Sequence, residues 1–479
     1  MVSEQQVASK QITRFIDSPL PKLLVLTHAM GGGVARHVAE VSSALRDRAH
    51  VVQVIPDGVV LRFVIPGLTK DESEVHLAFK WPGQQELFWR FVAQLGIVQV
   101  HVHHVFNWPA DFWPVFLRKM PGFDLTLHDH CIFSHVSGDD CTDAEELKWL
   151  VRVQRCFGGK KRWESRCLYQ LASAARRVFV PSRAMHGRIC QYFPELGTHR
   201  LLYQPHPEAE LLQGEYPAPY TRPLSADQPL RVLCLGMLSA EKGAQVLARV
   251  ARQAHKAGMP FEFHLLGSCH VHLPGYIIKH GSYEDRQVPG LLETIDPHVL
   301  WLPAQHPETW SYTLSAGLVA GLPIVATNIG AFPERLQHRP LSWLCDVELS
   351  VSEWLGVLLA VRERHQARRG LMYSWRNKKT KPFYTALANG YLLVNEQSPC
   401  EKLPPLTGWQ ISQALVEGLP EASQWRDRLL RLLLRLKYSP MLAPLVKLIP
   451  YTWQRQLKRL ISRAPLHEPP VADNGRENR

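Results

Sequence analysis

A carboxylate and three hydroxyl side chains stand close together in the second half of the chain. Glu308 precedes Ser311, Tyr312 and Thr313, and small residues then lead to an apolar run at 324–326. This order predicts a loop that enters a helix near Ser311. The N–H groups at a helix start can bind an anion, and a carboxylate can accept hydrogen bonds from hydroxyl groups. A phosphorylated sugar carries both kinds of group. The N–H groups expected to take part are those of Ser311, Tyr312, Thr313 and Leu314.

A second loop can bring a cation to the same place. Gly236 follows an apolar strand, and Lys242 comes just before a predicted helix. A lysine at this point can reach a diphosphate that lies across the strand ends, where its charge stabilises a leaving group. Simpler interpretations stay open. Lys242 can be a solvated residue of the first helical turn, Glu308 a surface carboxylate, and Ser311 an ordinary helix cap.

The order of residues from Glu308 to Pro323 resembles the nucleotide-sugar signature of the retaining glycosyltransferases of family 4, which have the two-domain GT-B fold. The resemblance implies that Glu308 binds sugar hydroxyls, that Lys242 binds the donor diphosphate and that the helix start binds the distal phosphate. Two positions depart from the family pattern. Ala316 stands where the family has a second glutamate, which is associated with the ribose, and Met237 replaces an arginine.

The resemblance also points to residues in the first half of the chain. Gly31, Gly32 and Gly33 follow the first strand, where the family places a loop near the donor diphosphate and the acceptor. His128 corresponds to a cleft histidine whose carbonyl or ring can contact the sugar.

Three further residues are candidates for the same cleft. Arg36 follows the glycines in the first turn of the predicted helix, and His103 and His104 end an earlier strand. An arginine there can contact phosphate. A solvated helix face for Arg36, and a structural role for each histidine, stay open as alternatives.

Apolar runs that suit buried strands alternate with helical stretches along most of the chain. This alternation predicts an α/β protein with parallel sheets covered on both faces. The proline-rich segment 205–229 has no periodic pattern and separates two such runs, so it is expected to be a linker. The expected strands are 23–26, 51–55, 97–102, 125–128, 178–181, 201–203, 232–235, 261–266, 276–279, 299–302 and 324–326.

The expected architecture is therefore GT-B: two Rossmann-like domains that face a central cleft, with a basic helical extension at the C-terminus. A chain of 479 residues is long enough for two cores. The expected parts are a flexible N-terminus at 1–20, an acceptor-side domain at 21–206, a linker at 207–229, a nucleotide-sugar-binding domain at 230–375, a basic amphipathic helical extension at 376–463 and a disordered tail at 464–479.

Composition indicates a cytosolic protein without a membrane-spanning helix. No apolar run reaches the length of about 18 residues that a bilayer requires, and the polar N-terminus does not resemble a signal peptide. The nine cysteines are scattered, as expected for reduced thiols. One cluster lacks tight ligand spacing, so buried thiols are expected there rather than a zinc site: His128, His130, Cys131, His135, Cys141 and Cys156.

Most of the positive charge is local. The net charge is +12, and the segment 421–463 holds ten Lys or Arg against two acidic residues, a net of +8. Leucines and tryptophans recur there at helical spacing beside arginines. Such a pair of helices can lie on anionic lipid, or it can pack on the protein body with a solvated basic face. Nucleic acid is a weaker alternative, because aromatic platforms are not interleaved with the charge.

The leading hypothesis is a glycosyltransferase, peripheral on the inner face of the cell membrane. It would move a sugar from a nucleotide-diphosphate-sugar to a glycan or lipid-linked acceptor with retention, in surface polysaccharide or lipopolysaccharide synthesis, without a metal or other cofactor. The alternative is a catalytically impaired GT-B protein that acts as a binding subunit of a polysaccharide assembly complex, and Ala316 and Met237 favour it. A nicotinamide oxidoreductase is more remote, because the glycine triplet lacks the required spacing.

Overall fold

The computed structural model divides the chain into two compact units. The first contains residues up to 126, together with 174–177 and 403–416. The second contains 127–173 and 178–367. The structure describes residues 4–29, 31–69, 71–141, 143–157, 162–197, 200–208, 216–269, 271–367 and 403–416. Of the predicted helical extension at 376–463 the structure describes only 403–416. The basic segment at 421–463 and the tail at 464–479 lie outside the described residues.

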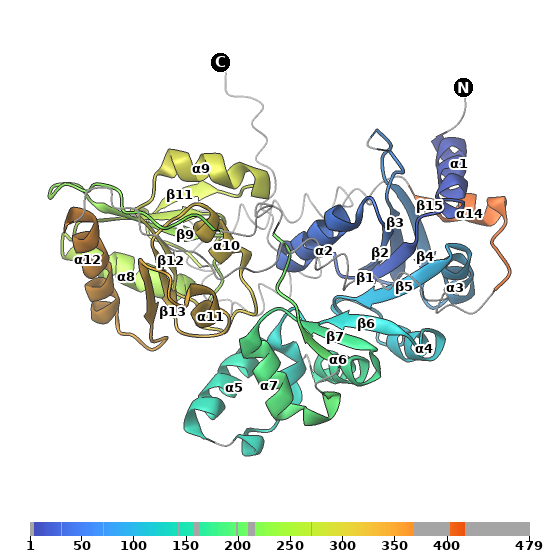
Figure 1. Ribbon diagram of the computed structural model, residues 1–479, viewed down its shortest axis with the longest axis horizontal. Helices are drawn as coiled ribbons and strands as arrows, with labels where there is room; N and C mark the ends of the chain where they lie inside the picture. The colour runs from blue at the N-terminus through green and yellow to red at the C-terminus, as the bar shows by residue number, and fades with distance from the viewer. Residues whose placement is uncertain are drawn as a thin grey trace, which may run out of the picture. The chain divides into compact units, whose positions relative to one another are not determined.

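The first unit alternates strands and helices, as the sequence predicts (Figure 1). Its elements are α1 (Glu4–Ile16), β1 (Lys22–Leu26), α2 (Gly32–Leu45), β2 (His50–Asp57), β3 (Val60–Ile65), β4 (Val75–Lys80), α3 (Gln85–Gln94), β5 (Ile97–Val102), α4 (Phe112–Lys119), β6 (Phe123–Thr126), α14 (Gly408–Ala414) and β15 (Leu415–Val416).

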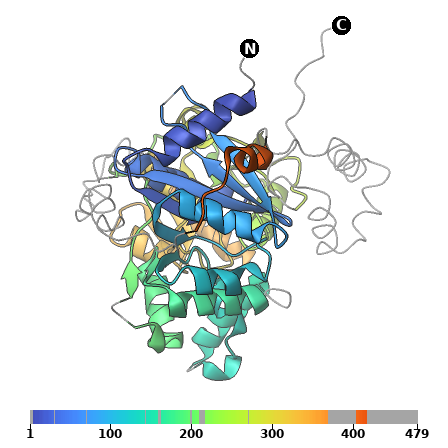
Figure 2. The ribbon, with the colours of Figure 1, turned by 90° about the vertical axis from the view of Figure 1, so that its right-hand side faces the viewer.

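The strands of the first unit follow the order β15-β4-β3-β2-β1-β5-β6. The pairs β1–β2, β1–β5 and β5–β6 are parallel, which confirms the predicted parallel core. The edge is antiparallel: β2–β3, β3–β4 and β15–β4. The strands β3 and β4 were not predicted, although Asp57-Gly58 between two apolar runs is a hairpin signal. Figures 1 and 2 both place α14 beside α1 at this edge.

A buried carboxylate stabilises the first unit at the end of its parallel strands. Asp124 of β6 is fully buried. Its Oδ2 accepts hydrogen bonds from Arg177 at 2.7 Å, Arg176 at 3.1 Å and Gln99 at 2.8 Å. Several donors therefore offset the cost of removing this charge from water.

We predict that Asp124→Asn destabilises the first unit by about 3 kcal/mol, because it leaves two arginines beside a neutral, buried amide. Chemical denaturation monitored by circular dichroism measures the change. Glu145→Gln is the control, because Glu145 forms an ion pair with Lys148 on the surface, and we expect no measurable effect. Equal effects of the two substitutions would contradict a special role for Asp124.

The second unit begins with a helical segment and continues into a second parallel sheet. Its elements are α5 (Ala144–Phe157), α6 (Arg162–Ala174), β7 (Arg177–Val180), α7 (Arg183–Tyr192), β8 (Leu201–Tyr203), β9 (Leu230–Leu235), α8 (Ala244–Lys256), β10 (Phe261–Leu266), β11 (Ile278–Gly281), α9 (Val288–Ile295), β12 (Val299–Leu302), α10 (Tyr312–Val319), β13 (Ile324–Thr327), α11 (Phe332–Leu336), β14 (Ser342–Cys345) and α12 (Val351–Ala367).

The six strands of this sheet follow the order β11-β10-β9-β12-β13-β14, and every neighbouring pair is parallel. Both faces are covered. Val232 and Cys234 of β9 pack with α8 and α12 in one apolar cluster, while Leu233 and Leu235 pack with α9, α10 and α11 in another. The predicted α/β class with parallel sheets is confirmed. In such sheets, ligands bind beyond the carboxyl ends of the strands.

Candidate active site

Lys242 and Glu308 meet at the carboxyl edge of the second sheet. Lys242 lies on the loop after β9, and Glu308 on the loop between β12 and α10. Lys242 Nζ is 3.2 Å from Glu308 Oε1, and the two side chains are 42% and 21% exposed. A partly exposed ion pair contributes only about 0–1 kcal/mol to stability. A ligand can therefore replace either partner at low cost.

Backbone contacts hold the loop of Lys242 against the loop of Glu308. The Glu241 carbonyl accepts hydrogen bonds from Gln305 N at 2.7 Å and from His306 N at 3.2 Å. Gly243 has a φ of 89°, and a Cβ there would lie 2.0 Å from the Pro303 carbonyl oxygen. Only glycine fits this approach. Two loops that are distant in the sequence are thus joined next to the ion pair.

A third loop supports Glu308 from the end of β13. Ala331 N donates to the Glu308 carbonyl at 2.8 Å. Gly330 has a φ of 62°, and a Cβ there would lie 2.4 Å from the Glu308 carbonyl oxygen. The glycine therefore allows the backbone of this loop to touch that of Glu308. The ends of β9, β12 and β13 together fix the position of one carboxylate.

The helix start predicted near Ser311 is present, because α10 begins at Tyr312. The Ser311 hydroxyl accepts a hydrogen bond from Leu314 N at 3.3 Å and lies 3.0 Å from the Thr313 hydroxyl. The structure thus contains the ordinary helix cap that the sequence left open, and a cap can yield its donor to a ligand. Gly236, at the end of β9, lies against the Thr313 side chain. The candidate phosphate-binding residues of the second unit are therefore close together.

Another helix start in the second unit already has an anionic partner. The carboxylate of Glu334 accepts hydrogen bonds from Arg183 N at 3.1 Å and Ala184 N at 2.9 Å, at the start of α7. The Ser182 hydroxyl accepts from Met185 N at 3.2 Å. Burial raises the pKa of Glu334. This end of α7 shows how the fold neutralises N–H groups with a carboxylate, whereas α10 is capped by a neutral hydroxyl.

His128 is attached to the loop of Glu308 through its main chain. The Thr309 hydroxyl donates to the His128 carbonyl at 2.6 Å. The His128 ring lies 5.0 Å from the ring of His206, centroid to centroid. The sequence predicted that either the ring or the carbonyl of His128 contacts the sugar. Because Thr309 uses one acceptor position of the carbonyl, the ring is the better candidate.

The remaining predicted residues belong to the first unit. Gly31 precedes α2, which begins at Gly32, and the φ angles of these two glycines are 66° and 69°. Gly33 lies in the first turn of the helix. Arg36 is 3.8 Å from Glu40 on the same helix. The structure confirms the predicted order of strand, glycine turn and helix, and the role of these residues in binding stays a prediction.

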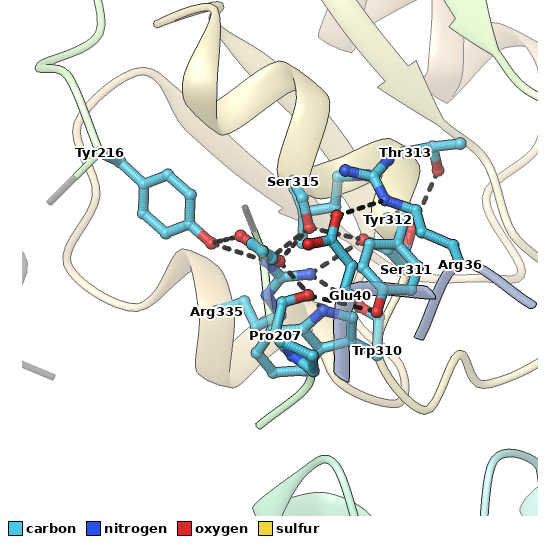
Figure 3. Close-up of polar contacts among 12 residues, drawn as sticks. Arg36, Glu40, Pro207, Tyr216, Trp310, Ser311, Tyr312, Thr313, Ser315 and Arg335 are labelled. Carbon is cyan, nitrogen blue, oxygen red and sulfur yellow. Dashed lines mark hydrogen bonds and ion pairs between the residues drawn. The ribbon is translucent and has the colours of Figure 1, made fainter. Parts of the chain in front are cut away.

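A buried ionic cluster that was not predicted from the sequence lies behind the start of α10. Arg335 of α11 donates to Glu208 at 3.0 Å, and both side chains are almost fully buried. Tyr216, Trp310 and Ser315 also contact this pair (Figure 3). No motif signals the cluster, because Glu208 lies in the predicted linker, far from Arg335 in the sequence.

Several members of the cysteine and histidine cluster have hydrogen-bond partners in the structure. His135 Nδ1 lies 2.7 Å from the Ser165 hydroxyl, and Cys141 Sγ lies 3.6 Å from the Tyr192 hydroxyl. Cys131 is buried. These groups take part in packing and hydrogen bonding, and the expected absence of a zinc site stays a prediction.

Comparison with known proteins finds one family model that matches part of the chain. The model of Glycosyltransferase Family 4 matches residues 31–196. This stretch begins at the glycine turn and includes His128, and it ends before Lys242 and Glu308. The match thus supports the family 4 resemblance in a part of the chain other than the one whose motifs carried it. No curated protein matches this sequence.

The solved structures found by a search with this chain include the following three. HepE of Anabaena, in complex with UDP and glucose, is 13% identical, with 72% of this chain and 94% of that chain covered and a TM-score of 0.46. Sucrose-phosphate synthase of Thermosynechococcus elongatus is 14% identical, with 78% of this chain and 98% of that chain covered and a TM-score of 0.45. The lipopolysaccharide outer core galactosyltransferase WaaB is 11% identical, with 72% of this chain and 90% of that chain covered and a TM-score of 0.43. Among the described residues, no helix is long and apolar enough to cross a bilayer.

Beside the Glu308 loop lies a histidine with an unusual environment. His130 is buried, and neither ring nitrogen has a hydrogen-bond partner among the described residues. Its ring lies 5.8 Å from that of His306. Burial, aided by the charge of His306, lowers the pKa of His130 from 6.5 to about 3. The folded protein therefore keeps this imidazole neutral where the unfolded chain would protonate it.

We predict that His130 makes the protein sensitive to acid. Its contribution to stability is fully present above pH 6.5 and is lost as the pH falls toward about 3. In this range the imidazole is protonated in the unfolded chain and stays neutral in the folded chain. His130→Phe should reduce the slope of unfolding free energy against pH in this range by up to about 1.4 kcal/mol per pH unit. Urea denaturation across pH measures it. The exposed His338→Phe is the control, and an unchanged slope in His130→Phe would refute the prediction.

We also predict that Gly330→Ala weakens the binding of a nucleotide-sugar donor, because a Cβ at Gly330 displaces Glu308. The clash and the positive φ together should cost about 1–3 kcal/mol of unfolding free energy. Gly258→Ala is the matched control, because Gly258 also has a positive φ but no atom lies near its ideal Cβ. If both variants bind donor equally well, the contact between Gly330 and Glu308 is not functional.

Proposed function

We propose that the protein is a glycosyltransferase that moves a sugar from a nucleotide-diphosphate-sugar to a glycan or lipid-linked acceptor. One observation carries the proposal: Lys242 and Glu308 lie 3.2 Å apart, next to the start of α10, at the carboxyl edge of a parallel sheet. A cation, a carboxylate and a helix N-terminus in one place suit a ligand with phosphates and hydroxyls. The match to the family 4 model over residues 31–196 supports the same class.

In this proposal the donor replaces the contact between the two charged side chains. The diphosphate takes Lys242 as its counter-ion, and its distal phosphate accepts hydrogen bonds at the start of α10. Glu308 turns to the sugar and accepts hydrogen bonds from its hydroxyls. The ring of His128 contacts the sugar from the segment that follows β6, and Gly31, Gly32 and Gly33 approach the diphosphate and acceptor.

The reaction breaks the bond between the anomeric carbon and the diphosphate oxygen, which leaves with the electron pair. The acceptor hydroxyl oxygen forms the new bond on the same face of the sugar, and its proton passes to the departing diphosphate. Lys242 and the N–H groups of α10 stabilise the charge that develops on the leaving group. The proposal includes retention of configuration, no requirement for a metal cofactor, and a role in surface polysaccharide or lipopolysaccharide synthesis at the cytoplasmic face of the membrane.

A second function is favoured by two specific residues. Ala316 and Met237 offer no hydrogen bond or charge where the family 4 signature has a glutamate and an arginine. With these groups absent, the protein can bind a nucleotide sugar without transferring it. It would then act as a binding subunit of a polysaccharide assembly complex. Donor binding without any transfer to an acceptor separates this function from the first.

We predict that Glu308→Ala and Lys242→Ala each lower the rate of sugar transfer roughly a hundredfold or more. Each substitution removes a group that stabilises the transition state of the transfer. The measurement uses the full chain, a panel of nucleotide sugars that includes UDP-glucose, and a lipid-linked acceptor extract. Matched controls are Glu293→Ala and Lys256→Ala, which change exposed residues on neighbouring helices and should leave transfer unchanged. A chelator in the assay tests the metal-free proposal.

The outcomes separate the two functions. Transfer by the wild type that both site variants lose supports the enzyme. Stabilisation by nucleoside diphosphates in a thermal shift assay, lost in both variants but accompanied by no transfer, supports the binding subunit. If the wild type neither binds nor hydrolyses nor transfers any donor of the panel, both proposals fail.

A further inference from the structure

Arg335 donates hydrogen bonds to the main chain just before α10. One of its guanidinium nitrogens donates to the Trp310 carbonyl at 3.0 Å and to the Ser311 carbonyl at 2.9 Å. The guanidinium also lies over the Trp310 ring, 3.9 Å from its centroid. The Arg335 side chain is only 5% exposed. It therefore acts on the loop from inside the protein and not as a surface group.

These two hydrogen bonds determine where two N–H groups point. A trans peptide is planar, and its C=O and N–H point in opposite directions. The Trp310 carbonyl shares its peptide with Ser311 N–H, and the Ser311 carbonyl shares its peptide with Tyr312 N–H. Because Arg335 holds both carbonyls on its own side, it directs both N–H groups away from itself. Successive N–H groups that point to one side form a concave anion-binding arrangement.

The backbone conformation at Ser311 is strained and needs support from its surroundings. Its φ is 78° and its ψ is 93°, and a positive φ in a residue with a Cβ costs about 1–3 kcal/mol. Such a conformation persists only when its surroundings enforce it. The two hydrogen bonds from Arg335 and the bond between the Ser311 hydroxyl and Leu314 N provide that enforcement.

Glu208 in turn fixes Arg335. The other guanidinium nitrogen donates to Glu208, to the Tyr216 hydroxyl and to the Ser315 hydroxyl, each at 3.0 Å. Glu208 is 3% exposed and also accepts from Tyr216 at 2.6 Å, from the Trp310 indole at 3.0 Å and from Ser315. The planar fork of arginine can donate to the two carbonyls from one nitrogen and toward Glu208 from the other, and the ammonium of lysine cannot reproduce this geometry.

We propose that Arg335, held by Glu208, is a positioning residue that shapes the Ser311–Tyr312 backbone for the distal phosphate of the donor. The inference rests on the proposed nucleotide-sugar site and deepens it, because it assigns the recognition of that phosphate to backbone N–H groups set by a buried arginine. Arg335 does not touch the ligand. It acts on affinity only through the two peptide groups.

The simpler interpretation is that the buried pair only stabilises the second unit. In that case a substitution at Arg335 lowers the melting temperature and lowers the affinities for the nucleoside and for the nucleoside diphosphate equally. If Arg335 positions the phosphate loop, the substitution lowers the affinity for the diphosphate and leaves that for the nucleoside unchanged. The two interpretations therefore differ in the ratio of two dissociation constants, and stability alone does not separate them.

The test compares Arg335→Lys with the wild-type full chain. Dissociation constants are measured by calorimetry and by ligand-observed NMR, first for the four common nucleoside diphosphates and then for the nucleoside of the one that binds most tightly. We expect Arg335→Lys to raise the dissociation constant of the diphosphate roughly tenfold or more and to change that of the nucleoside less than about twofold. A diphosphate constant that is unchanged, or a loss equal for both ligands, overturns the inference.

Two further variants keep the test decisive. Arg339→Lys is the matched control, because Arg339 is also buried and also donates to a carbonyl, that of Leu322 at 2.8 Å, away from α10. It should lower stability without changing the ratio. Tyr216→Phe removes one bond to Arg335 and should weaken the diphosphate selectively even if Arg335→Lys does not fold. If the wild type binds no nucleoside diphosphate at all, the proposed function itself fails, and this result is distinct from failure of the inference.

Discussion

The chemistry proposed for this protein depends on close backbone packing at the carboxyl edge of the second sheet. Lys242 and Glu308 contribute little to stability as an exposed pair, so their proximity is a consequence of the loops that carry them. Gly243 against Pro303 and Gly330 against Glu308 permit approaches that a side chain would prevent. A site built on main-chain contacts can exchange an internal ion pair for a ligand without losing its shape. The fold thus holds the proposed donor site in shape without a ligand.

Behind this edge lies a second layer of charge that does not face a ligand. Arg335 and Glu208 are both buried, and each would be costly alone in the protein interior. Their hydrogen bonds to Trp310, Ser311, Ser315 and Tyr216 compensate for that cost and order the start of α10. Nearer the edge of the sheet, Ala316 and Met237 have uncharged side chains. Much of the precision of this site is therefore located in the buried layer.

Local patterns in the sequence predicted several strands well. The strands expected at 97–102, 201–203, 261–266 and 299–302 have the predicted bounds in the structure. The antiparallel edge was missed, because β3 and β4 follow a tight hairpin and not the strand-helix alternation. The return of residues 403–416 to the first sheet could not be foreseen either. Its only strand, β15, has two residues, and its pairing with β4 depends on contacts between segments far apart in the chain.

The sequence by itself determined the α/β class, the order of the elements and the loops on which Glu308, Lys242 and Ser311 lie, because these follow from periodicity and short-range motifs. Only the tertiary structure decided that Lys242 and Glu308 form an ion pair, that His128 is bound through its carbonyl and that Glu208 reaches Arg335. The physical reason is that each of these contacts joins residues from separate loops. Their distance depends on how strands are ordered and helices packed, and no local pattern of residue types records that distance.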